Sequence, residues 1–542
     1  MNDLCKQWFE SSILSPKEKL EIKHLTNKEQ DIYFTHAPMS FGTAGVRGKM
    51  GMGTIRMNRF TYANLAQAYA KYIVTQYGKN KSIVIGHDNR LNSDKFALLV
   101  ADVISSFGVK VLLFAKNQLM PTPIVSYAIR QTKSVGGLII TASHNPKEYN
   151  GFKAYHDDGG QVLPGVANAI VKNFLKPLDV INYTCTPKRS LITYLSNDIV
   201  DKYLKDARVV LLNKNIISKN KSYPIVFTSH HGTASKLLPK FLKQLKFNVK
   251  PVPQQTFFSA SFVNSPISNP EVMESFDLSL KLANKVKSDI AIGVDPDADR
   301  MAICIKHNDE WRLMTGNEMG TIYTYYVLKH KRFAKTPYII SSYVSTYLID
   351  KIAKSYQAKV YRTGTGFKWM GAKVTEIGNR EIFVVAFEEA IGALNTTINR
   401  DKDSFTASAL ALEIYDHYKE SGMDLVDILE KEIYPKYGYW FGKTVSYTFD
   451  ILDWKPLIES KMQMFKQHKT KTIGDLRIRK ILWNKIGDCL EWHLENDSWI
   501  KFRMSGTEPK FKVYYNLNGK NQNILINQYN KLDKIFRQML GV

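Results

Sequence analysis

Short apolar runs alternate with amphipathic stretches over the first two hundred residues. Apolar residues recur with helical spacing in Tyr62–Tyr77 and Asp94–Phe107, whereas Ser82–Gly86 and Lys110–Phe114 have the length and composition of strands. Strands that alternate with helices of this length predict parallel βαβ units.

Similar units recur further along the chain. Strands are predicted at Pro224–Thr228 and Ile290–Val294, with a helix around Ser235–Leu245 between them. A third set follows, in which a helical stretch, Asn317–Lys329, precedes strands at Tyr338–Ser342 and Glu381–Phe387.

The pattern changes after about residue 435. Aromatic-rich alternating segments such as Gly438–Phe449 and Trp499–Met504 lead to a helix near Gln528–Leu540, which predicts a smaller α+β module. At 542 residues the chain is too long for one core. We therefore predict an α/β fold of four domains, with bounds at 1–205, 206–315, 316–435 and 436–542.

Composition narrows the function classes only slightly. A formal charge of +25 is compatible with nucleic acid, an acidic membrane surface or anionic small molecules as partners. The lysines are spread along the chain, so a solvated surface accounts for most of them.

Four well separated cysteines predict reduced thiols, and we expect neither a zinc site nor a disulfide framework. We expect no membrane-spanning helix and no signal peptide, which makes a cytoplasmic location the default expectation.

Three aspartates alternate between two apolar strands in IAIGVDPDADRMAICI. Carboxylates at Asp295, Asp297 and Asp299 repel one another unless a cation neutralises them, and oxygen ligands favour Mg²⁺. An EF-hand needs glycine at its sixth position and glutamate at its twelfth, where this chain has Arg300 and Lys306. Three solvated turn aspartates are the other alternative, and the strands on both sides favour the metal.

A serine stands beside a histidine and two lysines in the loop TASHNPKEYNGFK. Its hydroxyl, on Ser143, becomes a useful nucleophile when its proton is removed and the phosphorus it attacks is made electrophilic. Residues His144, Lys147 and Lys153 are placed to help. Taken singly, His144 is also compatible with a structural role, in which it satisfies a backbone carbonyl.

Further cationic and glycine-rich segments predict contacts to phosphate. In KFRMSGTEPKFKVY, a guanidinium, two hydroxyls and flexible backbone fall within five residues, at Arg503, Ser505, Gly506 and Thr507. Weaker signals are FGTAGVRG, which carries Arg47, and GHDNRLNS, which carries Arg90. Together these segments predict a phosphoryl-transfer site assembled from several domains.

Four stretches, TASHNPKEYNGFK, GVDPDADR, FEEAIG and RMSGTEPK, resemble in order and separation the α-D-phosphohexomutase family of phosphoglucomutases and phosphomannomutases. The resemblance covers Gly42 to Tyr514. It implies three related α/β domains and a smaller C-terminal domain around a central cleft.

The resemblance also implies a mechanism. Ser143 would be phosphorylated, and its phosphate would share Mg²⁺ with the three aspartates. The phosphoryl group would pass to a sugar monophosphate, and the resulting bisphosphate would turn around and return its other phosphate. A sugar 1,6-bisphosphate would activate the enzyme. By motif, Arg47, Lys153 and His144 would flank the transferring phosphate, Arg300 would lie at the same centre, and the Arg503 loop would hold the other phosphate.

The sugar itself would meet the FEEAIG loop through Glu388. Relatives commonly carry serine two residues after that glutamate, where this chain has Ala390. The EEA form, with TGFKWM before it and RDKDS after it, resembles the branch that includes phosphopentomutases and broad phosphohexose mutases. Lys402 would reach the distal phosphate or a sugar hydroxyl; alternatively Glu389, Lys402 and Asp403 form a surface ion-pair network.

The sequence thus predicts an Mg²⁺-dependent phosphohexomutase acting on mannose phosphates, glucose phosphates or both. A phosphopentomutase or phosphoglucosamine mutase on the same scaffold is the close alternative. A phosphatase or kinase-like enzyme that uses the same serine and, from another class, a basic nucleic-acid-binding protein are the remaining ones. We expect sugar phosphates as partners, with neither nucleic acid nor membrane, and the sequence leaves the oligomeric state open.

Overall fold

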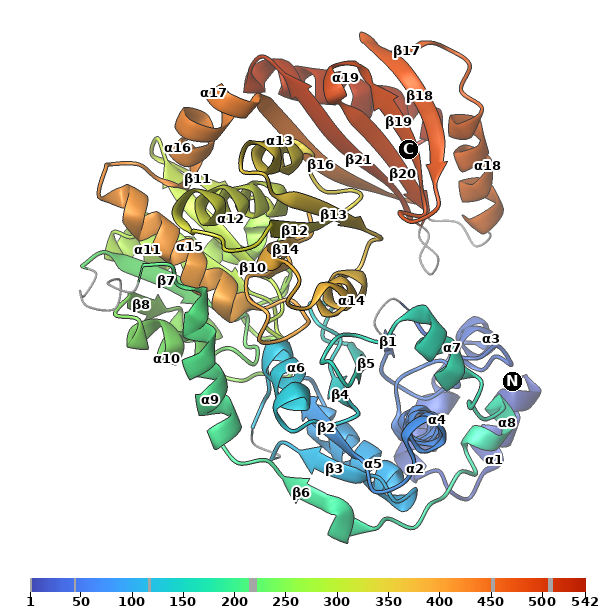
Figure 1. Ribbon diagram of the computed structural model, residues 1–542. Helices are drawn as coiled ribbons and strands as arrows, with labels where there is room; N and C mark the ends of the chain where they lie inside the picture. Colours follow the sequence, from blue (N-terminus) through green and yellow to red (C-terminus); the bar gives the residue numbers. More distant parts are fainter. Residues whose placement is uncertain (1, 43–44, 116–117, 214–221, 450–453, 505–509) are drawn as a thin grey trace. The chain divides into compact units, whose positions relative to one another are not determined.

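The computed structural model describes residues 2–42, 45–115, 118–213, 222–449, 454–504 and 510–542. The chain divides into two compact units. The first comprises residues 1–313, 371–376 and 392–410, and the second comprises residues 314–370, 377–391 and 411–542. Figure 1 shows the helices and strands of both units. No helix among the described residues combines the length and hydropathy needed to cross a bilayer.

The first unit begins with three short helices and a six-stranded sheet. Its strands are β1 (Gly45–Lys49), β2 (Ser82–His87), β3 (Lys110–Leu113), β4 (Gly136–Ile140), β5 (Tyr149–His156) and β6 (Ile192–Tyr194), in the order β1-β5-β4-β2-β3-β6. The pairs β2–β3, β2–β4 and β3–β6 are parallel, whereas β5 runs antiparallel to both β4 and β1. The predicted βαβ units are therefore present, and an antiparallel edge extends them.

The helices around this sheet are α1 (Asp3–Glu10), α2 (Pro16–Lys23), α3 (Asn27–Tyr33), α4 (Arg59–Tyr77), α5 (Ser93–Ser106), α6 (Thr122–Gln131), α7 (Pro164–Val171), α8 (Pro177–Val180) and α9 (Asp198–Asp206). Four of these described helices, α1 to α4, begin at a capping side chain. The side chain of Asn58 caps α4 by accepting from the backbone N–H groups of Phe60 and Thr61, and α4 ends at Gly78, whose φ is +83°. Apolar side chains of α4 and α5 pack against β2 and β4 to form the core of this part.

A second sheet in the first unit has five strands. They are β7 (Pro224–Thr228), β8 (Asn248–Pro251), β9 (Ile290–Val294), β10 (Met301–His307) and β11 (Glu310–Leu313), in the order β11-β10-β9-β7-β8. Helices α10 (Leu237–Gln244) and α11 (Asp277–Val286) connect them, and the short strand β15 (Ala393–Leu394) also belongs to this unit. Strands β7, β8 and β9 are parallel, whereas β9 and β10 form an antiparallel hairpin whose turn carries the three aspartates.

The second unit contains a parallel sheet with strand order β13-β12-β14. Its strands are β12 (Pro337–Ser342), β13 (Lys359–Thr363) and β14 (Ile382–Phe387), accompanied by α12 (Gly316–His330), α13 (Leu348–Ser355), α16 (Leu425–Asp427) and α17 (Tyr434–Tyr437). Two helices, α14 (Phe367–Ile377) and α15 (Ser404–Lys419), have residues assigned to both units.

An antiparallel six-stranded sheet completes the second unit. Its strands are β16 (Tyr439–Thr448), β17 (Thr472–Ile473), β18 (Leu476–Asn484), β19 (Cys489–Leu494), β20 (Trp499–Met504) and β21 (Lys510–Gly519), in the order β16-β21-β20-β19-β18-β17. Helices α18 (Trp454–Lys466) and α19 (Gln522–Leu540) pack on this sheet and share its aromatic core, as Figure 1 illustrates for α19. The predicted α/β architecture with a smaller C-terminal α+β module is confirmed. The predicted domain bounds stay predictions.

Candidate active site

The turn between β9 and β10 brings three carboxylates together. Asp295, Asp297 and Asp299 are all buried, and each offers an oxygen within 4.8 Å of those of the other two. The turn is tight because Oδ1 of Asp295 accepts from the backbone N–H groups of Asp299, at 3.1 Å, and Arg300, at 3.0 Å. The Oδ1 atoms of Asp297 and Asp299 are buried and accept no hydrogen bond from the described residues. Such a donor set fits a hard divalent cation.

The surroundings of this turn shift the pKa values of Asp295 and Asp299 in opposite directions. Burial, and then repulsion by Asp297 and Asp299, raises the pKa of Asp295 well above its usual range. Burial alone would also raise the pKa of Asp299, but the ammonium groups of Lys153 and Lys402 outweigh burial and lower it. The ammonium groups of Lys153 and Lys402 thus stabilise the negative charge of Asp299, whereas Asp295 has its charged form disfavoured.

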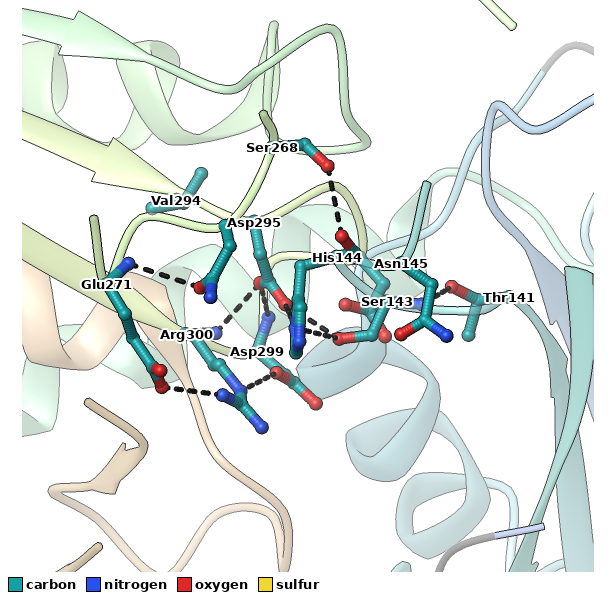
Figure 2. Close-up of polar contacts among 12 residues, drawn as sticks. Thr141, Ser143, His144, Asn145, Ser268, Glu271, Val294, Asp295, Asp299 and Arg300 are labelled. Carbon is teal, nitrogen blue, oxygen red and sulfur yellow. Dashed lines mark hydrogen bonds and ion pairs between the residues drawn. The ribbon is translucent and has the colours of Figure 1, made fainter. Parts of the chain in front are cut away.

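Ser143 lies directly against this centre. It follows β4, its φ is +54°, and its side chain is almost wholly buried. The hydroxyl donates to Oδ2 of Asp295 at 2.8 Å, and the backbone N–H donates to Oγ1 of Thr141 at 2.9 Å. Figure 2 shows the hydroxyl pointing at the aspartate turn from the opposite loop. A left-handed backbone at a serine is uncommon, and it is typical of functional sites.

His144 flanks the serine hydroxyl. Its Nδ1 atom lies 3.4 Å from Oγ of Ser143 and 4.0 Å from Oδ2 of Asp295. Burial, followed by the positive charges of Arg300 and Arg47, lowers the pKa of His144 well below its usual value. Its backbone carbonyl accepts from the hydroxyl of Ser268 at 3.3 Å, which fixes the residue to the second α/β sheet's connecting segment. His144 therefore makes a side-chain contact to the predicted nucleophile.

Two lysines converge on Asp299. Lys153 comes from β5, and its ammonium lies 2.6 Å from Oδ2 of Asp297 and 3.1 Å from Oδ2 of Asp299. Lys402 places its ammonium 3.0 Å from the same oxygen of Asp299 and 3.1 Å from Oδ1 of Asp401. Both lysines are buried.

The alternative of a surface ion-pair network around Lys402 is wrong. Lys402 and Asp403 are buried, and the carboxylate of Asp403 accepts from the hydroxyl of Tyr203 at 2.7 Å and from Asn399 at 3.1 Å. The carboxylate of Glu389 in the second unit accepts from the hydroxyls of Ser342 and Ser345. The three residues belong to separate networks: Lys402 pairs with Asp299 and Asp401, whereas Asp403 and Glu389 accept from other hydroxyl and amide donors.

Two arginines border the same centre. Arg47 lies on β1 opposite Gly151 of β5, and its Nη1 atom lies 3.5 Å from Oδ1 of Asn145. Arg300 donates to Oε1 of Glu271 at 2.8 Å, and its Nε atom lies 3.9 Å from Oδ1 of Asp299, as Figure 2 shows. The close approach of β1 to β5 requires glycine at residue 45, where a Cβ atom would lie 2.0 Å from the carbonyl oxygen of Phe152.

The other predicted residues belong to the second unit. Oε1 of Glu388 accepts from the backbone N–H of Gly366 at 2.8 Å, at the start of α14. Arg503 is at the end of β20, where its backbone pairs with that of Lys512. Ser505, Gly506 and Thr507 lie outside the described residues.

Sequence reasoning missed several residues that hold the aspartate turn. Thr122, at the start of α6, donates from its hydroxyl to Oδ2 of Asp297 at 3.2 Å and from its backbone N–H to the carbonyl of Asp297 at 2.8 Å. Ser404 donates to the carbonyl of Ala298 at 2.7 Å. The only local signal was a hydroxyl residue at a helix start, which is far too common to identify either one.

The chain is similar to known proteins over nearly its whole length. Residues 38–179, 201–308 and 315–435 match the family models described as "Phosphoglucomutase/phosphomannomutase, alpha/beta/alpha domain" I, II and III. A phosphomannomutase of Mycoplasmoides pirum is 44% identical over 543 residues and covers 100% of both chains. A phosphoglucomutase of Staphylococcus aureus is 31% identical over 522 residues, covering 92% of this chain and 93% of that one. Among solved structures, the putative phosphomannomutase of Thermus thermophilus shares the fold, with a TM-score of 0.72, 20% identity, and coverage of 94% of this chain and 100% of that one.

Proposed function

The chain belongs to the phosphoglucomutase/phosphomannomutase family, whose members are intramolecular phosphotransferases of the isomerase class, and from that premise we propose how its residues interconvert hexose 1-phosphate and hexose 6-phosphate. The observation that carries the proposal is the hydroxyl of Ser143, which lies 2.8 Å from a buried three-carboxylate turn. A nucleophile in that position can carry a phosphoryl group beside a divalent cation. The branch within the family stays a prediction.

Asp295, Asp297 and Asp299 would hold the Mg²⁺ ion together with an oxygen of phosphorylated Ser143. When bound, the ion supplies positive charge that makes the phosphorus more electrophilic. The buried Oδ1 atoms of Asp297 and Asp299 accept no hydrogen bond from the part of the chain that the structure describes, and this supports the role, since a buried anionic oxygen requires a compensating partner.

In the first half-reaction, a hydroxyl of the sugar phosphate attacks the phosphorus of phosphorylated Ser143. The new O–P bond forms as the bond between phosphorus and Oγ breaks, the attacking hydroxyl gives up its proton, and Oγ takes one. His144, which contacts Oγ of Ser143, and Lys153 would move these protons, and Arg47 and Arg300 would border the transferring group. The second half-reaction runs the same bond changes in reverse at the other phosphate of the sugar 1,6-bisphosphate.

Glu388 and Arg503 in the second unit would bind the sugar hydroxyls and the phosphate that is not transferred. Lys402 would contribute a further cation; its position on Asp299 supports a role near the aspartate turn more than one at the distal phosphate. A sugar 1,6-bisphosphate would serve as activator because it phosphorylates Ser143 when the resting enzyme has lost its phosphate. We place the enzyme in the cytoplasm, where sugar phosphates are made and used.

Intact-mass measurement of the purified protein tests the assignment. After incubation with glucose 1,6-bisphosphate, the wild type should gain the mass of one phosphate, and Ser143→Ala should gain none while keeping its far-UV circular dichroism spectrum. The same variant should lose mutase activity toward mannose 1-phosphate and glucose 1-phosphate. Full activity in Ser143→Ala would refute the proposed nucleophile. Faster turnover of ribose 1-phosphate than of either hexose would favour the phosphopentomutase alternative.

A further inference from the structure

One arginine binds the backbone of the loop that carries Ser143. Nη2 of Arg90 donates to the carbonyls of Ser143, at 2.6 Å, and Asn145, at 2.5 Å. Nη1 donates to the carbonyls of Pro146, at 2.8 Å, and Tyr149, at 2.9 Å. All four terminal N–H bonds of the guanidinium are therefore used by one loop. Arg90 has no terminal donor left for a phosphate, which is the contact that its sequence motif suggested.

The guanidinium is itself held in place. Its Nε atom lies 3.2 Å from Oδ2 of Asp88, and both side chains are completely buried. The other oxygen of Asp88 accepts from the backbone N–H of Arg90 at 2.9 Å and from the hydroxyl of Ser93 at 2.8 Å. The ring of Phe262 lies with its centroid 5.2 Å from the guanidinium carbon. A buried charge with this many partners has one orientation, since any other would leave hydrogen bonds unmade.

Arg90 also connects the ends of two neighbouring strands through the carbonyl of Ser143. The strand β2 that precedes Arg90 is the sheet neighbour of β4, which precedes Ser143, so the guanidinium bridges two adjacent strand ends. With its φ at +54°, Ser143 directs its carbonyl to Arg90 and its hydroxyl to Asp295. A non-glycine residue keeps such a backbone only when its surroundings enforce it. The bond from Arg90 to the carbonyl of Ser143 is one such constraint.

We propose that Arg90 is a positioning residue, which fixes the loop of Ser143 so that the hydroxyl stays within bonding distance of the aspartate turn. The inference rests on the proposed function, because it assumes that Ser143 carries the phosphoryl group. Lysine cannot replace Arg90, since an ammonium has three donors around one nitrogen and cannot reach four carbonyls in the plane of a fork. The predicted defect is therefore one of phosphoryl transfer, with substrate binding largely retained.

The test compares Arg90→Lys and Arg90→Ala with Arg130→Lys. Arg130 is a matched control, since it is a partly buried arginine of the same unit that donates to the carbonyls of Asp158 and Ile398 instead. We expect Arg90→Lys to lower kcat by about 100-fold, a loss that a misplacement of a reacting group by about 1 Å can cause, while KM stays within about threefold. Arg130→Lys should leave kcat per folded molecule near that of the wild type.

Chemical rescue separates positioning from general stability. Millimolar guanidinium chloride should restore part of the activity of Arg90→Ala, and the same concentration of methylammonium chloride should restore none. Arg90→Lys covers the case in which Arg90→Ala does not fold. A kcat of Arg90→Lys close to the wild-type value, or an equal loss in Arg130→Lys, would overturn the proposal. If wild-type protein takes up no phosphate on Ser143 in the mass measurement, the proposed function fails first, whatever the Arg90 variants do.

Discussion

A buried ion pair in the C-terminal sheet makes the stability of the second unit depend on pH. Glu491 lies on β19 and Lys501 on β20, with their charged atoms 3.0 Å apart and both side chains buried. His493 also donates to Glu491, at 2.8 Å. The ammonium of Lys501 donates further to the carbonyl of Tyr343 and packs over the ring of Trp499, so it joins this sheet to the preceding part of the unit.

The magnitude follows from the pKa of Glu491. Burial alone would raise this pKa, but the hydrogen bond from His493 and the charge of Lys501 outweigh burial and lower it from 4.5 to about 2. At about 1.4 kcal/mol per pKa unit, the difference is worth about 3 kcal/mol of folding free energy. Because the folded pKa is the lower one, this contribution is complete above about pH 4.5 and is lost as the pH falls toward about 2.

Glu491→Gln should therefore cost about 3 kcal/mol at pH 7, and the gap to wild type should shrink to about 2.5 kcal/mol at pH 4 and about 1.5 kcal/mol at pH 3. Urea unfolding followed by tryptophan fluorescence measures it, because five of the eight tryptophans lie after residue 435. Asp475→Asn is the control: its exposed pair with Lys531 should contribute less than about 1 kcal/mol. A cost no larger than that of the control, or a gap that does not change with pH, would refute the reasoning.

Two further predictions concern the active site. Dialysis against EDTA should abolish mutase activity, and added Mg²⁺ should restore it in the wild type. The same Mg²⁺ concentration should not restore activity in Asp297→Asn, because the aspartate turn of that variant lacks one anionic ligand. Activity that survives chelation would contradict the metal assignment. Ala390→Ser should change the ratio of kcat/KM for mannose 1-phosphate to that for glucose 1-phosphate by about fivefold. This factor corresponds to one added hydrogen bond of about 1 kcal/mol. An unchanged ratio would show that specificity is set elsewhere.

The regular elements were predictable because their signals are local. Ser82–Gly86 became β2, Lys110–Phe114 became β3, and Asn317–Lys329 became α12, each within a residue of its predicted bounds. The start of α4 was missed by three residues because Asn58 caps the helix before its apolar pattern begins. The family was predictable for the same reason, since motifs such as TASHNP and DPDADR are contiguous in sequence. The family models confirm both the family and the architecture.

Contacts that support the site were not predictable from local patterns. Arg90 followed a strand and a glycine, which suggested a phosphate contact, and its donors are instead used by carbonyls more than fifty residues away. Nothing in a sequence states which way a backbone carbonyl will point. Thr122 and Ser404 were missed for a related reason, because one hydroxyl is indistinguishable from many others until the fold places it against the aspartate turn.

The balance of charge at the aspartate turn favours binding of the proposed Mg²⁺ ion and phosphorylation of Ser143 at the same time. Three carboxylates are accompanied by the ammonium groups of Lys153 and Lys402, and Arg300 lies beside Asp299. A phosphorylated serine adds a charge of about −2, and an Mg²⁺ ion adds a compensating charge of about +2. Binding both leaves the net charge nearly unchanged, whereas binding either alone would leave about two charges unbalanced in a buried site. The lysines therefore do not need to move away when the phosphoryl group and the ion are present together.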